Sequence, residues 1–483
     1  MPSPVEAPPE SDRLDPSIWK ISSVVVLGSF LSQLDATVVN VSLSSLAVTF
    51  HSSLSAIQWV TSGYLLALAL ILPLSGWMVD RIGAKALYLW CFSAFTLSSG
   101  LCGLAWSVNS LIGFRILQGM SGGLMAPMAQ MMLARTAGKH MASVLSFAAM
   151  PILLAPLLGP VIAGAILQFA SWRWLFLINL PVGALALVLA VLFLPNDREE
   201  TKPRDLDLVG LALLSPGLVL FLYGADHISD RAGLAALAGS MLLLVTFFKW
   251  ATRKKEKAII DLQLFTGKVF SAAATTQFLA NGISFAGQML IPVFLIRACG
   301  RSPSETGLLL APLGLGMMCG YPFVGAMTKR FGNRRVSAGG GLLALAGTLP
   351  FVYLASHGLA IAILACALFL RGMGQSAVGT PSITAAFSSV KREDLPMATT
   401  TLNIVMRIGG PTLTTISATF LGWRLASAHN PDAVQGAFTA AFILLCIFHG
   451  LLIAAAMRLP LSVESGTKQT VAITPVVLKS VSE

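Results

Sequence analysis

Apolar segments of about 20 residues recur along the whole chain, and they constrain the fold more than any other feature. A helix of that length crosses the hydrocarbon core of a bilayer, whereas a strand of a membrane barrel is much shorter. Of the 483 residues, 55% are hydrophobic and 11% are charged, whereas a soluble domain carries about 25% charged residues. The sequence therefore predicts an all-α integral membrane protein.

Hydropathy predicts fourteen such spans, with limits good to a few residues. Since fourteen is an even number, both ends of the chain are expected on the same side of the membrane. The predicted spans are 20–44, 56–79, 86–106, 109–134, 143–168, 173–194, 206–226, 232–251, 270–297, 304–328, 336–355, 358–388, 396–422 and 435–458.

Basic residues predict which side that is. They concentrate in every second loop, and such an excess is typical of cytoplasmic loops, so both termini are expected in the cytoplasm. This topology explains the net charge of +11. No stretch combines aromatic and basic residues as a single-strand binder does, so no nucleic-acid partner is expected. The basic residues of these alternate loops are Arg81, Lys85, Arg135, Lys139, Arg198, Lys202, Arg204, Arg253, Lys254, Lys255, Lys257, Lys329, Arg330, Arg334, Arg335, Lys391 and Arg392.

The chain also repeats itself at a nearly constant offset. GWMVDRIGAK at 76–85 is similar to GAMTKRFGNRR at 325–335, an offset of 249 residues. Gly119 and Gly372, in QGM and RGM, are 253 residues apart, and the two Gly-Pro pairs ending at Pro160 and Pro411 are 251 apart. Duplicated halves are typical of transporters built from two six-helix bundles.

The predicted organisation follows from the spans and the repeat. Two helices are inserted between the duplicated halves, because six spans need fewer residues than the offset provides. The expected parts are a disordered cytoplasmic tail at 1–19, an N-terminal six-helix bundle at 20–195, two inserted transmembrane helices at 196–260, a C-terminal six-helix bundle at 261–460 and a cytoplasmic tail at 461–483.

Asp35 lies near the middle of the first apolar segment, and no second Asp or Glu lies so deep in any other. An ionised carboxylate at that depth costs roughly 2.5–3.5 kcal/mol on insertion scales. A chain retains such a group where it faces a wet cavity or takes up a proton. We interpret Asp35 as a proton or substrate site; the alternative is a partly solvated polar residue without a function.

Other chemistry is not indicated. The six cysteines are scattered without metal-ligand or disulfide spacing. The nucleotide-binding pattern GxxxxGK[ST] is absent, and no catalytic triad, HExxH or carboxylate pair is placed at one membrane depth. We expect no metal, no cofactor and no enzymatic activity. His449 is expected to be a packed neutral imidazole, with a proton relay as the alternative.

Several segments resemble the major facilitator superfamily, and within it the fourteen-span drug:proton antiporters. In detail their sequences most resemble those of bacterial multidrug exporters. The resemblance covers about 20–460. It implies two six-helix bundles plus two inserted helices, in a bacterial cytoplasmic (inner) membrane. The matching segments are LDATVVNVSL (Leu34 to Leu43), GWMVDRIGAK (Gly76 to Lys85), RILQGMSGG (Arg115 to Gly123), PLLGPVIAG (Pro156 to Gly164), SWRWLFLINLPVG (Ser171 to Gly183) and DLDLVG (Asp205 to Gly210).

The turn after the second span is predicted to be a conformational latch. Glycines there allow close helix packing and a tight turn. The acidic residue can accept hydrogen bonds from a helix N-terminus or an arginine, and the basic residues keep the loop on the cytoplasmic side. The alternative is a solvated topogenic turn. In the second copy Lys329 replaces the acid, so no equivalent latch is expected there. The latch residues are Gly76, Asp80, Arg81, Gly83 and Lys85.

Arg115 begins the fourth span, and the resemblance assigns it the role of a cationic partner that tunes protonation of Asp35. The alternative is that Arg115 lies at a helix end and that its side chain extends to the lipid headgroups. Arg371 is expected near the outer surface, and Arg407 either faces the cavity or snorkels. These arginines have no acidic neighbour in sequence.

The fifth span contains helix-breaking and small residues, Pro156, Gly159, Pro160 and Gly164. The resemblance implies the kinked helix of antiporters, associated with export. Ala155 and Ala163 depart from that pattern, since glycine is usual at both places. A purely structural kink is the alternative.

The leading prediction is proton-coupled efflux of small lipophilic compounds or drugs by alternating access, driven by the proton gradient. Expected partners are the small-molecule substrate, protons and the lipid bilayer; a monomer is expected, and a periplasmic adaptor is left open. The alternatives are proton-driven uptake or export of a specific metabolite, and a non-transporting membrane receptor on the same fold. Candidate cavity residues are Asn40, Gln118, Gln277, Asn281, Phe285 and Gln288.

Overall fold

The computed structural model describes residues 16–137, 140–196, 205–228, 230–427 and 431–461, and most of both expected tails lies outside these ranges. The described residues are almost entirely helical and contain no strand. The helices are α1 (Pro16–Thr49), α2 (Leu54–Ile71), α3 (Ser75–Ile82), α4 (Ala84–Gly103), α5 (Val108–Ala137), α6 (Met141–Phe169), α7 (Trp174–Leu177), α8 (Asn179–Phe193), α9 (Leu208–Asp226), α10 (Arg231–Lys254), α11 (Lys268–Arg297), α12 (Pro303–Leu309), α13 (Ala311–His357), α14 (Ile361–Ser388), α15 (Leu395–Ala426) and α16 (Pro431–Ala456).

Ten segments of the described residues are long and apolar enough to cross a membrane. One of them, Glu305–His357, has 53 residues and is divided at Gly332, where the backbone leaves the helical conformation. The helices α5, α6 and α15 add three more, of 30, 29 and 32 residues. With the divided segment counted twice, the described chain has fourteen helical segments of spanning length, and its all-helical architecture confirms the predicted fold class.

The duplicated turn has the same backbone conformation in both halves. Gly83 has φ 83° and ψ 156°, and Gly332 has φ 82° and ψ 163°. This region of positive φ is essentially restricted to glycine, because a Cβ atom would clash with the backbone. In each half the glycine ends one span and begins the next, so the sequence repeat is also a structural repeat.

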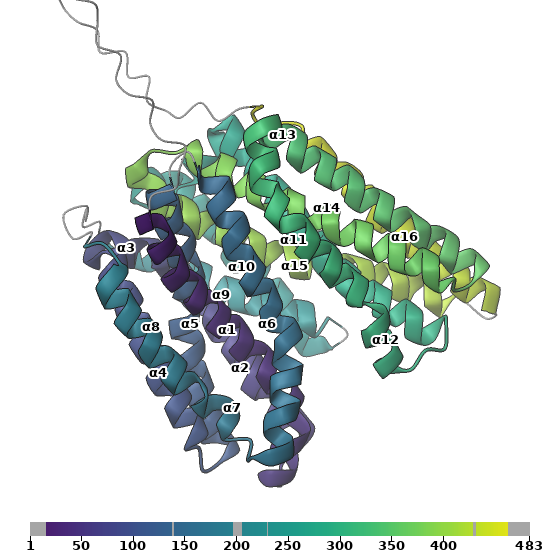
Figure 1. Cartoon of the computed structure of the whole chain (residues 1–483), viewed down its shortest axis with the longest axis horizontal. Helices are drawn as coiled ribbons and strands as arrows, with labels where there is room; N and C mark the ends of the chain where they lie inside the picture. The colour runs from purple at the N-terminus through teal and green to yellow at the C-terminus, as the bar shows by residue number, and fades with distance from the viewer. Residues whose placement is uncertain (1–15, 138–139, 197–204, 229, 428–430, 462–483) are drawn as a thin grey trace, which may run out of the picture.

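Helices α1–α8 form one bundle and α11–α16 form the other (Figure 1). We call the end where α1 begins and α16 ends the terminal face. The bundles lie together at the terminal face, and their helices diverge toward the end that carries α7 and α12 (Figure 1). The sequence repeat therefore folds into two similar units that meet at one end.

Hydrogen bonds and apolar packing join the two bundles near the terminal face. The Ser75 and Thr400 hydroxyls are 2.7 Å apart and buried, and Asn403 Nδ2 donates to Gln130 Oε1 at 2.9 Å. One hydrophobic cluster contains buried residues of both bundles, including Val79 and Leu402. These contacts close the molecule at the terminal face.

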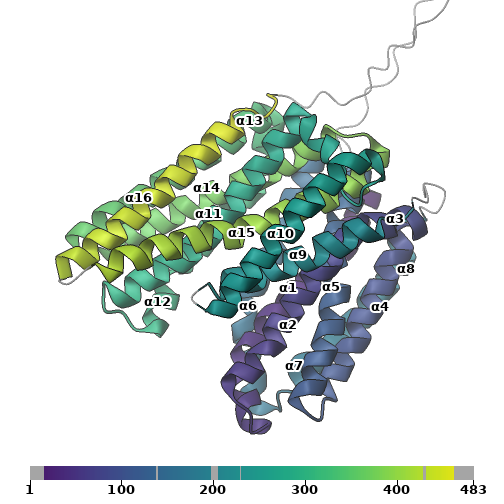
Figure 2. The same cartoon turned by 180° about the vertical axis from the view of Figure 1, so that it is seen from behind.

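The inserted helices α9 and α10 lie outside both bundles, across their junction (Figure 2). α9 packs against α2 of the first bundle and α15 of the second. Leu218 of α9 shares a buried cluster with Leu72 and Ile404, which come from opposite bundles. The pair is therefore peripheral, yet α9 contacts both halves.

Candidate functional site

α1 places Asp35 in the interior of the first bundle, with a residue exposure of 2%. Its carboxylate accepts three hydrogen bonds from side chains of other helices. Arg115 Nη1 donates to Oδ2 at 2.5 Å, and Gln118 Nε2 and Asn179 Nδ2 donate to Oδ1 at 3.1 and 2.9 Å. The carboxylate is thus fully surrounded by donors from α5 and α8.

Arg115 is the cationic partner of this carboxylate and is itself fully buried. Its Nη1 also donates to Gln118 Oε1 at 2.8 Å, and its Nε donates to the Val60 carbonyl at 3.2 Å. The guanidinium carbon lies 4.1 Å from the centroid of the Tyr64 ring, a cation–π contact. Because Arg115 is enclosed by protein, it does not extend to the lipid headgroups.

Asn179 completes the cluster, and it was not among the residues predicted from the sequence. It is the first residue of α8, after the short α7, and it donates to Ser99 Oγ at 3.0 Å as well as to Asp35. Ser99 in turn donates to the carbonyl of Phe176. The available signal was that Asn179 is the only side-chain amide in the predicted span 173–194.

The energetics of the cluster follow from its burial. Two opposite charges in a low-dielectric interior attract strongly, but each loses its hydration, so the pair adds little net stability. Removal of one partner leaves an uncompensated buried charge, which costs about 3–5 kcal/mol. Loss of the charge on either Asp35 or Arg115 would therefore leave the other charge uncompensated inside the first bundle.

The predicted cavity residues divide into different environments. Gln118 belongs to the Asp35 cluster rather than to an open cavity wall. Gln277 is buried and donates to the Gly379 carbonyl at 2.7 Å and to Ser382 Oγ at 2.8 Å, so it ties α11 to α14.

The four other cavity candidates belong to α11 and α1. Asn281 is half-buried and donates to the carbonyl of Gln277 in its own helix. Phe285 and Gln288 are exposed. Asn40 belongs to α1, but its side chain lies outside the described part of the structure. Phe285 and Gln288 are thus the candidates most available for a ligand.

The predicted latch lies at the terminal face against the opposite bundle. A Cβ atom at Gly76 would lie 3.0 Å from Thr400 Oγ1 and 3.2 Å from the Pro396 carbonyl oxygen, so the glycine permits close approach of α3 and α15. Asp80 is buried at 8% exposure. The close approach predicted from the sequence is therefore a contact between the two halves.

The basic latch residues have different surroundings. Lys85 Nζ donates to the carbonyls of Val191 and Leu194 at 3.1 and 2.7 Å, at the end of α8. A cation near a helix C-terminus is favourable because the last carbonyls lack helical partners. Arg81 is exposed and lies over the Trp77 ring, 5.5 Å from its centroid.

The predicted kinked helix is α6, which is continuous from Met141 to Phe169. Gly159 packs against Thr37 of α1, two residues from Asp35, and Thr37 Oγ1 lies 3.4 Å from the Ala155 carbonyl. Gly164 is exposed and faces no neighbour within 4 Å. The side chains of Pro156 and Pro160 lie outside the described part.

Two predictions about the second bundle can be checked against the structure. Arg371 is 1% exposed and donates to Thr348 Oγ1 at 3.0 Å and to the Ile283 carbonyl at 3.1 Å. Small residues, including Gly287, leave room for it inside the bundle, and its expected place near the outer surface of the membrane stays a prediction. His449 is buried, with Nδ1 2.8 Å from the Leu445 carbonyl.

Comparisons with known proteins agree with this architecture. The family model described as Major Facilitator Superfamily matches residues 25–412 and 273–479. The chain is 32% identical over 472 residues to the Multidrug resistance protein B homolog of Mycobacterium tuberculosis (strain ATCC 25618 / H37Rv), covering 96% of this chain and 83% of that protein.

Solved structures share the fold at low sequence identity. The human organic anion transporter MFSD10 (TETRAN) superposes with a TM-score of 0.61 at 15% identity, covering 90% of this chain and 100% of that one. The proton:xylose symporter XylE bound to 6-bromo-6-deoxy-D-glucose gives 0.60 at 17% identity, covering 89% and 94%. By its family match, its related sequence and its fold, the chain belongs to the major facilitator superfamily of membrane transporters.

Proposed function

We propose that this transporter exports small lipophilic compounds by exchange with protons. The observation that carries the proposal is the buried Asp35 carboxylate, held by Arg115, Gln118 and Asn179 in the first bundle. A carboxylate inside the membrane can carry one proton per cycle without a bound cofactor. The proton gradient then supplies the driving force.

Competition for Asp35 couples the two fluxes in this proposal. From the outside Asp35 takes a proton, its attraction for Arg115 falls and the affinity for substrate falls with it. From the inside the proton leaves and the substrate binds. Alternating access requires that the two bundles rock about this site so that it opens to one side at a time.

The orientation follows from the basic loops. Many of the basic residues, including Arg81, Arg330 and Lys391, belong to turns at the terminal face, and the positive-inside rule makes that face cytoplasmic. The bundles are joined at this face by Ser75 and Thr400. If the terminal face is cytoplasmic, these contacts support an outward-facing state, in which the cytoplasmic gate is closed.

The lipophilic substrate class is supported by the related Mycobacterium tuberculosis protein, whose name refers to multidrug resistance. It is also supported by Phe285, which is 53% exposed on α11 and packs beside Gly410 of α15. Adaptable aromatic surface suits ligands of varied shape. The alternatives, uptake of a metabolite and a receptor without transport, differ from this proposal most in the direction of transport.

Transport of a lipophilic fluorescent dye in inverted membrane vesicles tests the function directly. An exporter accumulates dye inside the vesicles when the interior is acidified, and releases protons as it does so. An uptake system would move the dye in the opposite direction under the same gradient. A receptor without transport activity would show neither movement, and either result would overturn the proposal.

A further inference from the structure

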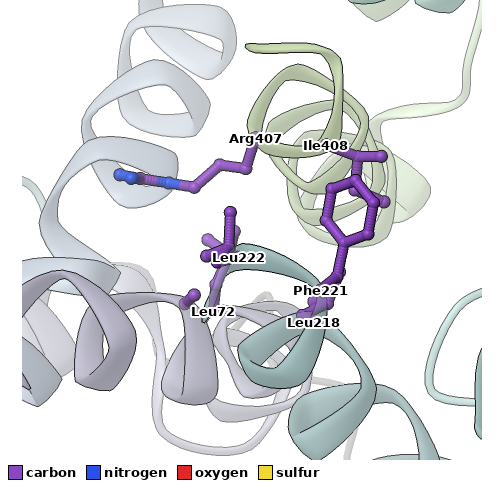
Figure 3. Close-up of a pocket in the computed structure, with 7 residues that line it drawn as sticks. Leu72, Leu218, Phe221, Leu222, Arg407 and Ile408 are labelled. Carbon is purple, nitrogen blue, oxygen red and sulfur yellow. The ribbon is translucent and has the colours of Figure 1, made fainter. Parts of the chain in front are cut away.

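The inserted helix α9 contacts both bundles at two levels along its length. At the level nearer the terminal face, Leu218 lies in a buried cluster with Leu72 and Ile404 of opposite bundles. Arg407 leaves α15 at this level and extends over Leu222 and Leu72 toward the first bundle (Figure 3). Residues of all three elements line one narrow gap here: Ala69, Leu72, Leu218, Phe221, Leu222, Arg407 and Ile408.

The second level lies at the C-terminal end of α9, toward the end of the molecule that carries α7 and α12, which we call the divergent end. Tyr223 stacks on Trp59 of α2, with the ring centroids 6.2 Å apart and the ring planes at 20°. Thr415 Oγ1 of α15 donates to the carbonyl of Ala225 at 3.4 Å. The end of α9 is therefore attached to one helix of each bundle.

The inserted pair is built as a firmly packed unit. Ser240 Oγ of α10 donates to the carbonyl of Gly217 in α9 at 2.8 Å. A Cβ atom at Gly224 would lie 2.7 Å from the carbonyl oxygen of Gly233, so the two helix backbones approach closely. Near the terminal face, Asp207 accepts hydrogen bonds from a side chain of α10 and from an amide of the segment after it. α9 is thus held by α10 along its length.

The position of α9 decides how it acts on the bundles. Transporters built from two such bundles alternate access by rocking one bundle against the other, which changes the separation of their helices at the divergent end. α9 lies outside both bundles and across their junction (Figure 2). A movement that separates α2 from α15 must therefore break the contact of α9 with one of them.

We propose that α9 is a strap that limits how far the two bundles separate at the divergent end. The strap holds α2 through the stacked rings of Tyr223 and Trp59, and it holds α15 through Thr415. The inference does not rest on proton exchange or on which face is cytoplasmic, because it concerns only the separation of the bundles.

Distances between spin labels at Leu104 and Leu308 test the proposal in full-length protein in lipid nanodiscs, without substrate or a pH gradient. Both residues are exposed; Leu104 follows α4 in the first bundle and Leu308 belongs to α12 in the second. The four native cysteines that are not buried are first replaced by serine. Tyr223→Ala should raise the population with longer distances about twofold to tenfold, the range expected for loss of one aromatic stacking contact.

Two variants test whether the contact between the rings causes the effect. Trp59→Ala removes the other ring and should widen the distances to the same extent. The double variant should widen them no further than either change alone, because both act on one contact. Tyr223→Phe keeps the stacked ring and should give the distances of the parent protein.

Tyr353→Ala is the matched control for the loss of a tyrosine. Tyr353 stacks on His357 four residues later in α13, with centroids 4.2 Å apart, as Tyr223 stacks on His227 in α9 at 4.4 Å. Both changes remove a stack within one helix, but only Tyr223→Ala also removes a stack between α9 and a bundle. Tyr353→Ala should leave the label distances unchanged.

The contact with the second bundle has its own pair of variants. Thr415→Val removes the hydroxyl that donates to Ala225 and should also raise the population with longer distances. Thr412→Val removes a hydroxyl that donates to the carbonyl of Ile408 in the same helix, and it should have no effect. Size-exclusion chromatography and thermal unfolding establish that each variant is folded.

Three results would overturn the proposal. Parent-like distances in both Tyr223→Ala and Trp59→Ala would mean that the stacked rings do not restrain the bundles. Shorter distances in these variants would mean that α9 holds the bundles apart instead of together. An equal change in Tyr353→Ala would mean that the loss of a tyrosine, rather than the loss of the strap, causes the effect.

Discussion

Gly76 and Gly325 occupy equivalent places in the duplicated turn, and each brings a helix of its own bundle against the opposite bundle. A Cβ atom at Gly76 would meet Thr400 and Pro396 of α15, and one at Gly325 would lie 2.5 Å from the Cα atom of Ser143 in α6. The second copy thus keeps the close approach although Lys329 replaces the acidic residue. Closure of the terminal face uses both copies of the turn.

Gly325→Val should open the terminal face, because the added side chain would collide with the backbone of α6. Overpacking of this kind costs about 1–3 kcal/mol, which corresponds to a shift of the conformational equilibrium of about fivefold to 150-fold. Gly76→Val should have a smaller effect, since its nearest neighbour is the Thr400 hydroxyl, which can rotate. Distances between spin labels at Leu192 and Arg330 measure the opening.

The matched control for these variants is Gly339→Val. Gly339 lies on α13 with Gly325, but no atom would lie within 4 Å of its added Cβ atom. Its label distances should equal those of the parent protein. Equal opening in all three variants would show that helix propensity, rather than contact between the bundles, causes the effect.

Asp35→Asn should abolish proton-driven transport, because an amide does not take up a proton at physiological pH. Asp35→Glu keeps a titratable carboxylate and should retain part of the activity. The measurement is dye movement in inverted vesicles under an imposed pH gradient, at matched expression. Transport by Asp35→Asn at the parent rate would contradict the assignment of Asp35 as the proton site.

The buried pair predicts a specific pattern of stabilities. Arg115→Ala and Asp35→Asn should each destabilise the protein by about 3–5 kcal/mol, because each leaves one charge without its partner. The double variant should lose less than the sum of the two, since no unpaired charge remains. Unfolding transitions of the four proteins in detergent give the coupling. Additive losses would mean that the two side chains act independently.

Asn179→Ala removes one of the three donors to Asp35 and should impair transport while the fold is kept. A hydrogen bond to a charged group contributes about 1.5–3 kcal/mol. Ser99→Ala is the control, because Ser99 Oγ accepts a hydrogen bond from Asn179 but, within the described part of the chain, makes none with Asp35. Dye transport rates of the two variants should therefore differ, with the larger loss for Asn179→Ala.

The span pattern and the repeat could be predicted from sequence because membrane insertion depends on local composition. A segment of about 20 apolar residues forms a helix in the membrane independently of the rest of the chain. The duplicated turn was equally visible, because glycine and charged residues recur at a fixed offset. The place of Asp35 in a span followed from the same local argument.

The partners of Asp35 could not be obtained in this way. Asn179 lies 144 residues from Asp35, and its packing against α1 depends on how α7 and α8 cross the bundle. The enclosure of Arg371 within the second bundle could not be predicted from composition either. Its burial depends on space left by glycine on another helix, which hydropathy does not encode. Tertiary packing decides both cases.

Asp207 connects the ends of the inserted helices near the terminal face, and its carboxylate is buried. It caps α9 by accepting from the Gly210 amide at 3.1 Å, and it also accepts from Trp250 Nε1 at 3.0 Å and from the Ile259 amide at 3.2 Å. Burial opposes ionisation, but these hydrogen bonds and the Lys254 ammonium outweigh it and lower the pKa of Asp207 below its ordinary value.

The lowered pKa fixes the sign of the pH dependence. A carboxylate whose pKa is lower in the folded protein contributes stability above its unfolded pKa, and this contribution is lost as the pH falls through the folded value. Asp207→Ala should remove it at neutral pH, and loss of the helix cap alone costs about 0.5–2 kcal/mol. Amide hydrogen exchange at 208–211 and 258–260 should then accelerate. Asp205→Ala removes an exposed acid two residues earlier and should leave the exchange rates of these amides unchanged. Equal acceleration in both variants would show that Asp207 does not hold the ends of the inserted helices together.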